Sequence, residues 1–343
     1  MKPKISSNKM KAIIHSKYGP PDELQLLEVE KPVPGDNEVL IKIHATTVTT
    51  TDCNARNFTF VPESFMFLAR LMFGLKKPRI KILGIDLAGE IETIGKNVKL
   101  FKTGDHVFGS PGTKFGGHAE YVCVPENGAL AIKPADLSWE KAAAISLAGN
   151  TALFFIRDLA KIQSGQTILI HGASGAIGTY AVQLAKYYGA VVTGVCSGAN
   201  AALVKSLGAD KVIDYTKEDF TKSAERYDFV FGVVGKTTFA QCKGLLKPKG
   251  IYLENMMEVK DFLKVLWTSI TGGKKIKGGV STERADNLKF FNELIESGKL
   301  IPVIDKVYPL ERTAEAFQYV EQGHKKGNVV ITIKVPADYA DLR

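Results

Sequence analysis

The pattern of apolar and polar positions is clearest between residues 167 and 188. The short apolar run Thr167–His171 is typical of a buried strand, and beyond a glycine-containing turn apolar and small residues return at helical spacing from Ile177 to Tyr188. Five more strand-like runs follow, separated by helical stretches. This alternation predicts an α/β fold with a doubly wound parallel sheet of six strands. The later strands are expected at Val191–Val195, Val212–Tyr215, Asp228–Val234, Gly250–Glu254 and Ile276–Val280.

Residues 10–130 carry a different pattern, in which short strand-like runs are separated by glycine or proline turns. Such a pattern predicts a mostly antiparallel β domain. In Phe58–Leu75 large apolar residues recur every three or four positions, so we expect a helix that either packs on the core or forms a wall of a substrate cleft. The expected strands are Lys11–Ser16, Leu24–Glu30, Glu38–Ala45, Asp86–Ile94, His106–Phe108 and Ala119–Val124.

The C-terminal segment is expected to return to the N-terminal β domain through its last strand, which would make that domain discontinuous. The predicted domains are residues 1–129 with 283–343, and residues 130–282. Ligands of open α/β sheets bind at the carboxyl ends of the strands, so we expect the ligand in a cleft between these domains. The elements expected in the C-terminal segment are helices at Glu283–Ser297 and Thr313–Gln322 and strands at Val303–Pro309 and Asn328–Val335.

The turn after the first parallel strand contains three glycines at intervals of three residues. Gly172, Gly175 and Gly178 stand where the chain must bend tightly, where a backbone must approach a ligand and where a helix must pack closely on its strand. Free amides and the positive dipole end of the helix would then bind a pyrophosphate. Ala173 replaces the usual first glycine, so a turn that serves only chain geometry is the alternative. The residues expected to hold the pyrophosphate are Gly172, Ser174, Gly175, Ala176 and Ile177.

The end of the second parallel strand indicates which dinucleotide binds. A site for NAD normally places a carboxylate about 20 residues after the glycine turn, on the ribose 2′-hydroxyl. Residues 191–209 contain no carboxylate, so a 2′-phosphate would meet no repulsion there, and NADPH is the expected cofactor. Ser197, Asn200 and Tyr215 are the expected donors to this phosphate. The alternative is that Ser197 and Asn200 only cap the next helix.

Composition and charge set further limits. The 343 residues include 45 Lys and Arg against 36 Asp and Glu, a formal charge of +9, but the lysines are scattered, so nucleic acid is an unlikely partner. The N-terminal residues lack the apolar segment of a secretory leader, the four cysteines are widely spaced, and polar residues interrupt Phe58–Leu75 too often for a membrane span. These features predict a cytoplasmic protein with reduced thiols and no membrane segment.

The succession of motifs resembles the medium-chain dehydrogenase/reductase superfamily over residues 10–335. The motifs include GIDLAGEIETIG, FKTGDHVFG and AGNTAL before the glycine turn and GHKKGNVVI near the end. The turn HGASG-x-x-G and the motif SLGAD-x-V-IDY are most similar to those of the zinc-independent quinone oxidoreductase branch. The resemblance implies a GroES-like catalytic domain and an NADPH-dependent reductase of quinones or α,β-unsaturated carbonyls, homodimeric or tetrameric, of which we expect the homodimer.

The resemblance also assigns positions around the cofactor. It implies that Thr151 lies near the nicotinamide and that Val234, Asn255 and Met256 line the cofactor groove. Some relatives carry an arginine near Ala199, and its loss here should weaken NADPH binding.

Zinc-dependent members of the superfamily carry a cysteine three residues before an aspartate, and a later Gly-His-Glu. In this chain Thr49 precedes Asp52, and Ile85 stands at the histidine position. Neither side chain is a useful zinc ligand, so we expect no metal. Without a Lewis acid, a quinone or an enone is an easier hydride acceptor than a simple carbonyl, because the charge spreads over an extended system.

Asp52 and Asn54 are the candidate catalytic residues, which could orient the acceptor or the nicotinamide ribose. Many relatives have a tyrosine where Asn54 stands, so no general acid is evident, and the alternative is that residues 50–52 simply form a hydroxyl-rich turn. Two other functions stay open. One is a zinc-independent alcohol or aldehyde dehydrogenase, and the other is a non-enzymatic, crystallin-like protein that binds NADPH or RNA.

Overall fold

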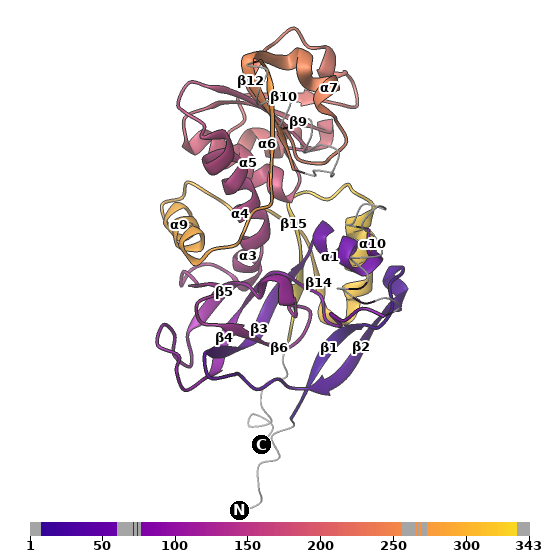
Figure 1. The fold of residues 1–343 in the computed structure, drawn as a ribbon, viewed down its shortest axis with the longest axis vertical. Helices are drawn as coiled ribbons and strands as arrows, with labels where there is room; N and C mark the ends of the chain where they lie inside the picture. Colours follow the sequence, from indigo (N-terminus) through magenta and orange to yellow (C-terminus); the bar gives the residue numbers. More distant parts are fainter. Residues whose placement is uncertain are drawn as a thin grey trace, which may run out of the picture.

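The computed structural model describes residues 8–59, 71, 74, 77–255, 265, 268 and 273–334. Two large sheets make up most of this part of the chain, a six-stranded sheet at the top of Figure 1 and a seven-stranded sheet at the bottom. Met256, most of Phe58–Leu75 and the last residue of the predicted strand Asn328–Val335 lie outside the described residues. Among the described residues, none of the helices is both long and apolar enough to cross a bilayer.

The six-stranded sheet is entirely parallel and has the strand order β10-β9-β8-β11-β12-β13. This order confirms the predicted doubly wound fold, and it reverses direction between β8 and β11, where such sheets bind their ligands. The strands are β8 (Thr167–His171), β9 (Val191–Cys196), β10 (Lys211–Asp214), β11 (Tyr227–Gly232), β12 (Leu246–Glu254) and β13 (Lys275–Gly278).

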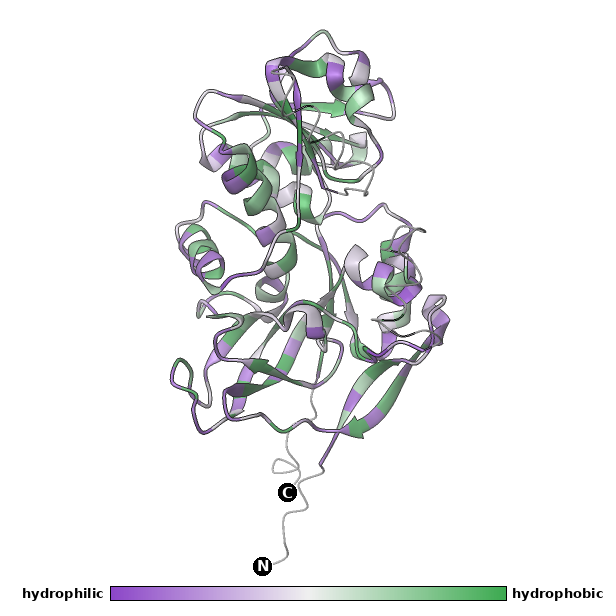
Figure 2. Ribbon diagram, in the orientation of Figure 1, coloured by the Kyte–Doolittle hydropathy of each residue, from purple (hydrophilic) through white to green (hydrophobic). Residues whose placement is uncertain are grey.

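Strand β8 is buried on both faces, as expected for the centre of a parallel sheet. Ile168 and Ile170 pack into one apolar core, which includes Leu184 of helix α5, whereas Leu169 faces a second core on the other side of the sheet. Figure 2 shows apolar residues, in green, along this sheet and on the helices beside it. The helices of the described chain include α1 (Thr50–Asn57), α3 (Trp139–Ala143), α4 (Ser146–Leu153), α5 (Ala176–Tyr187), α6 (Ala201–Ser206), α7 (Phe239–Cys242), α9 (Ala285–Glu296) and α10 (Thr313–Glu321).

The seven-stranded sheet is mostly antiparallel and has the order β14-β15-β3-β4-β5-β7, with β6 paired to β3. Val329 of β15 lies opposite Val48 of β3, so the last strand rejoins the N-terminal sheet as predicted. β14 and β15 run parallel to each other. The strands are β3 (Glu38–Val48), β4 (Leu87–Ile94), β5 (His106–Ser110), β6 (Tyr121–Pro125), β7 (Ala129–Ile132), β14 (Ile304–Pro309) and β15 (Asn328–Thr332), and β1 (Lys9–His15) with β2 (Leu24–Glu30) forms a separate hairpin.

Two elements of the N-terminal part differ from the prediction. Strand β7, which the sequence pattern did not indicate, pairs with β5, so this sheet continues beyond the predicted border at residue 129. Residues 50–57 form helix α1 rather than a turn, because Thr49 and Asp52 make a reciprocal capping box at its start. The domain borders themselves stay a prediction.

Helix α1 is fixed to α10 by a buried ion pair. Arg56 has a fully buried side chain that donates to Glu321 of α10 and to the backbone oxygen of Gly19. Asn57 adds a second hydrogen bond to the same Glu321 carboxylate, with a Nδ2 to Oε1 distance of 2.8 Å. One carboxylate of α10 thus accepts from two residues at the C-terminal end of α1.

We expect Glu321→Gln to destabilise the protein by about 1–3 kcal/mol, because the buried guanidinium of Arg56 would lose its charged partner. Urea unfolding of both proteins measures this difference. Glu315→Gln is the control, since Glu315 of the same helix pairs with the exposed Arg312 just before the helix and should change stability by less than about 0.5 kcal/mol. Equal stabilities of Glu321→Gln and the unchanged protein would contradict this account of α1.

Candidate active site

The glycine turn after β8 has the geometry of a dinucleotide-binding turn. Gly172 has a φ of 91°, and a Cβ there would lie 2.6 Å from Val234 Cγ1. A Cβ on Gly178 would overlap the carbonyl oxygen of Gly172, so only glycine lets α5 pack this closely on β8. A Cβ on Gly175, in contrast, would meet nothing nearer than 3.5 Å. The space over Gly175 is therefore left free by the protein.

Helix α5 begins at this free space without a capping side chain. Gly175 is its N-cap, and the first intrahelical bond runs from Thr179 N to Gly175 O at 2.9 Å. The backbone amides of Ala176 and Ile177 precede that bond and belong to the first turn, where helix geometry supplies no acceptor. The uncapped helix start and the free space together fit a bound pyrophosphate.

The C-terminal strand approaches the same turn from the other sheet. Gly327 N–H donates to the carbonyl oxygen of Ser174 at 2.8 Å, and Gly327 bridges Gly175 in parallel register. The Ser174 hydroxyl accepts from Asn200 Nδ2 at 3.1 Å. Sequence reasoning had placed Ser174 and Asn200 in the site but missed Gly327, whose contribution depends on where β15 joins the N-terminal sheet.

Asn200, one of the predicted cofactor-binding residues, has an unused acceptor. Its side chain is buried, its Nδ2 is occupied by Ser174, and its Oδ1 has no hydrogen-bond partner within the described chain. Ser197 and Asn200 stand at the N-cap positions of the two helical segments that follow them, but neither side chain makes a capping hydrogen bond. A buried acceptor without a partner costs free energy unless a ligand satisfies it, so Asn200 fits a binding role.

A carboxylate that the sequence window did not contain lies at the end of β9. Asp214, the last residue of β10, pairs with Cys196 in the parallel register and accepts the Gly198 backbone N–H. Its Oδ1 also accepts from Thr216 N at 3.0 Å and Thr216 Oγ1 at 2.7 Å. These hydrogen bonds, first those from Thr216, lower the pKa of Asp214 below its usual value. An ionised group therefore stands beside the strand end at which a dinucleotide ribose is expected.

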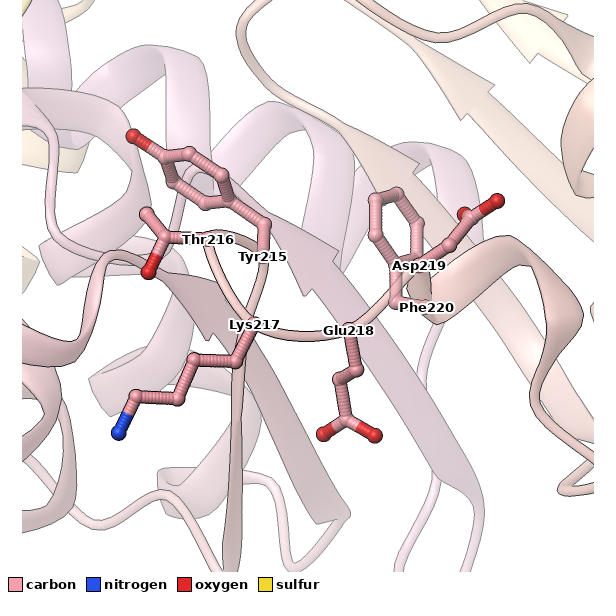
Figure 3. A pocket seen from close by; sticks show the side chains of 6 residues that line it. All are labelled: Tyr215, Thr216, Lys217, Glu218, Asp219 and Phe220. Carbon is pink, nitrogen blue, oxygen red and sulfur yellow. The ribbon is translucent and has the colours of Figure 1, made fainter.

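Tyr215 follows Asp214 at the rim of a hollow of about 320 Å³. Figure 3 shows Tyr215 and Phe220 on one side of the loop that lines this hollow and the ends of Lys217 and Glu218 on the other. Tyr215 is exposed, so its hydroxyl is accessible to a ligand. Its assignment to the 2′-phosphate stays a prediction.

The residues predicted for the nicotinamide end lie on three elements. Thr151, on α4, donates its hydroxyl proton to Leu147 O at 2.8 Å and contacts Ser281 Oγ at 3.1 Å. Asn255 Nδ2, at the end of β12, donates to Val233 O at 3.1 Å, and Val234 beside it is exposed. A Cβ on Gly172 would meet Val234, so Val234 lies beside the glycine turn.

Asp52 and Asn54 both lie on α1, but their surroundings differ. Asp52 is fully buried, and its Oδ1 accepts from Gly84 N at 2.9 Å. Its Oδ2 accepts from Thr49 N at 2.9 Å and from Thr49 Oγ1 at 2.6 Å. Asn54 is half-buried and accepts from Thr59 Oγ1 at 3.1 Å. Asp52 thus holds the start of α1, and a direct role of either residue with substrate stays a prediction.

Asp86 connects the two sheets and was missed as a site residue. Its Oδ2 accepts from Thr47 Oγ1 of β3 at 2.6 Å, and its Oδ1 accepts from Leu147 N of α4 at 2.8 Å. The Leu147 carbonyl accepts in turn from Thr151, so one chain of hydrogen bonds runs from β3 to the predicted nicotinamide contact. Burial raises the pKa of Asp86 to about 8, against the opposing effect of these hydrogen bonds.

The residues at the zinc positions do not fit that metal. The Thr49 hydroxyl is engaged in the capping box with Asp52, and Ile85 has no donor atom. Burial raises the pKa of the neighbouring Cys53 thiol to about 12, which disfavours the thiolate that binds zinc. Across the described ranges, no group of three or more His, Cys, Asp or Glu side chains has metal-binding geometry.

We expect Gly175→Val to weaken binding of a nicotinamide dinucleotide at least about tenfold, because its side chain would fill the free space above the turn. Fluorescence titration measures the affinity, and thermal unfolding should show a folded protein. Gly178→Val is the matched comparison, since its side chain would overlap the Gly172 carbonyl and should lower the unfolding temperature. Unchanged affinity in Gly175→Val would refute this placement of the pyrophosphate.

Asp86 should make stability depend on pH. Its pKa is about 3.9 in an unfolded chain and about 8 in the folded one, so the unfolded chain releases a proton that the folded chain keeps. The free energy of unfolding should therefore fall as the pH rises through this range. Asp86→Asn should show a smaller fall in urea unfolding between about pH 5 and pH 8.5. Parallel pH profiles for the two proteins would contradict the raised pKa.

Two family models match the chain. The alcohol dehydrogenase GroES-like domain matches residues 35–134, and the zinc-binding dehydrogenase model matches residues 207–331. The first range contains strands β3 to β7 of the N-terminal sheet, and the second contains strands β10 to β13 of the parallel sheet together with β14 and all but the last residue of β15. Both matches agree with the arrangement of strands described above.

Complete relatives are also similar. The chloroplastic NADPH-dependent alkenal/one oxidoreductase of Arabidopsis thaliana is 34% identical over 337 residues, which cover 94% of this chain and 79% of that protein. The mitochondrial NAD(P)H oxidoreductase RTN4IP1 of Homo sapiens is 33% identical over 357 residues, which cover 95% and 90% of the two chains. The solved quinone oxidoreductase of Coxiella burnetii has a TM-score of 0.84 at 29% identity and covers 95% of this chain and 100% of its own.

Proposed function

Because the chain belongs to the quinone oxidoreductase branch of the medium-chain dehydrogenase/reductase superfamily, it is an oxidoreductase that uses a nicotinamide cofactor, and we propose that it reduces a quinone or an α,β-unsaturated carbonyl with NADPH and without zinc. The observation that carries this proposal is the space above Gly175, where a Cβ would meet nothing nearer than 3.5 Å, at the uncapped start of α5, in a chain whose zinc positions hold no ligand.

Several residues are proposed to hold the dinucleotide. The amides of Ala176 and Ile177 would bind the pyrophosphate, with Gly172, Ser174 and Gly175 shaping the turn. Asn200, Ser197 and Tyr215 are proposed for the ribose end, and Thr151, Val234 and Asn255 for the nicotinamide end. Met256, which lies outside the described residues, keeps its predicted place beside Asn255.

Bound NADPH supplies a hydride, and the protein has mainly to orient the acceptor and exclude water. Asp52 is proposed to act by holding the first turn of α1, which leaves Asn54 as the residue of this pair that meets the acceptor. The Thr151 hydroxyl donates its hydrogen bond to the Leu147 carbonyl, so we do not assign it as the proton donor to the substrate. We infer that solvent supplies the proton to the reduced quinone or enone. The negative charge that hydride transfer leaves on this product is delocalised, so no strong acid of the protein is needed.

The preference for NADPH rests on the missing carboxylate in residues 191–209 and on the names of similar proteins. The Arabidopsis relative is named as NADPH-dependent, and the human one as an NAD(P)H oxidoreductase. Lys217, two residues after Tyr215, is a cation that lines the same hollow. The alternatives, an alcohol dehydrogenase or a non-enzymatic protein, are not favoured by these relatives.

Loss of NADPH absorbance with a panel of quinones, enones and simple aldehydes tests the proposed reaction. We expect turnover with quinones or enones that exceeds turnover with simple aldehydes by at least about tenfold and is unchanged by a zinc chelator. A parallel assay of alcohol oxidation with NADP⁺ is the comparison. Activity confined to alcohols or aldehydes, or abolished by the chelator, would overturn the proposal.

The assembly and the compartment are further parts of the proposal. A homodimer is expected from the family resemblance, and light scattering at several concentrations would measure it. The four cysteines are free in the structure, which agrees with a reducing compartment. A cytoplasmic location stays a prediction, since the two relatives described above are named as chloroplastic and mitochondrial.

A further inference from the structure

We propose that the side chain of Lys325 provides a cation for the pyrophosphate of the dinucleotide, beside the backbone amides at the start of α5. The inference rests on the proposed function, because it concerns the same dinucleotide site. It adds a charged side chain from the C-terminal segment to an anion site whose other proposed donors are backbone amides.

Lys325 lies in the loop that joins α10 to β15. Figure 1 shows α10 between α1 and the start of β15, in the middle of the molecule. The same loop meets the glycine turn of the parallel sheet, since Gly327 N–H donates to the Ser174 carbonyl oxygen at 2.8 Å and Gly327 bridges Gly175. The return of the chain to the N-terminal sheet therefore brings Lys325 to the turn.

The ammonium of Lys325 is held close to this contact. Its Nζ donates to the carbonyl oxygen of Gly327 at 2.8 Å. Gly327 and Gly175 pair as residues of neighbouring strands do, at about 5 Å, so the ammonium lies within about 10 Å of the Gly175 backbone. The flexible four-carbon stem of a lysine can bring the charge to a pyrophosphate that lies over Gly175.

Lys325 also has hydrogen-bonding capacity left. An ammonium carries three N–H donors, and in the part of the chain that the structure describes Lys325 makes one hydrogen bond and no salt bridge. The carboxylate of Asp305 is bonded elsewhere, because its Oδ2 accepts from the Tyr319 hydroxyl at 2.7 Å and from Lys326 N at 2.9 Å. A half-buried ammonium with unused donors suits an anionic ligand.

The surroundings of Lys325 weaken its hold on the proton. Burial lowers the pKa of the ammonium to about 8, against the opposing effects of Asp305 on β14 and the Cys53 thiol on α1. A pyrophosphate beside the ammonium would favour the protonated form, so dinucleotide binding should be accompanied by proton uptake. A lysine that only supports the loop would give no such uptake.

Lys325→Met tests the inference, because it removes the charge and keeps a side chain of similar length. NADH and NADPH are each titrated by fluorescence with no acceptor present. We expect Lys325→Met to bind both cofactors about tenfold more weakly, since both contain the pyrophosphate, and Lys325→Arg to stay within about threefold of the unchanged protein.

Lys306→Met is the matched control. Lys306 follows Asp305 on β14, but its side chain is exposed and its Nζ lies over the Tyr319 ring, 3.8 Å from the centroid. This variant changes the net charge equally and should leave both affinities within about twofold of those of the unchanged protein. Thermal unfolding of every variant checks that it is folded.

Calorimetry gives a second measurement, on the unchanged protein. ADP-ribose, which contains the pyrophosphate but neither the nicotinamide nor the 2′-phosphate, is titrated at pH 8 in buffers of different ionisation enthalpy. We expect uptake of about 0.3 to 0.5 proton per site, because close to half of the free ammonium is deprotonated at its pKa. Lys325→Arg should bind ADP-ribose without this uptake, because an arginine stays protonated.

The results separate the two proposals. Unchanged affinities in Lys325→Met, an equal loss in Lys306→Met, or binding of ADP-ribose without proton uptake would overturn the role of Lys325. A loss of affinity for NADPH alone would overturn it too, because the charge would then serve the 2′-phosphate. Failure of quinones and enones to oxidise bound NADPH would count against the proposed reaction alone.

Discussion

The close packing of helix α5 on strand β8 is the contact on which the candidate site depends. Gly178 permits it, because any Cβ there would overlap the backbone of Gly172. This approach brings the uncapped first turn of α5 to the end of the central strand, where the sheet order reverses. Backbone amides and a helix dipole then face the space over Gly175, where a Cβ would meet no described atom nearer than 3.5 Å, and an anion is the ligand that suits them.

The second sheet contributes through hydrogen bonds to the backbone of the first. Asp86 accepts the Leu147 amide at the start of α4, and Gly327 donates to the Ser174 carbonyl in the glycine turn. One contact lies near the predicted nicotinamide end and the other at the pyrophosphate end. The position of the GroES-like sheet is therefore coupled to both ends of the predicted dinucleotide site. A change in either contact should alter cofactor binding.

The chain keeps the framework of its family and departs from it at chemically decisive positions. Thr49 and Ile85 stand where zinc-dependent members have ligands, and Thr49 instead caps α1. In the proposed zinc-free reaction, acceptors that can delocalise charge are therefore favoured.

The local pattern of apolar, polar and glycine residues in the sequence predicted much of this structure. The six parallel strands, the roles of Gly172 and Gly178 and the helix after the turn follow from spacing, because steric limits and side-chain periodicity act over a few residues. The return of β15 to the N-terminal sheet also followed from the order of motifs. The placement of Asp214 beside Gly198, of Asp86 against α4 and of Gly327 against Ser174 did not. Each depends on strand register and on hydrogen bonds between residues far apart in the chain, and one residue of register would send these side chains to the opposite face.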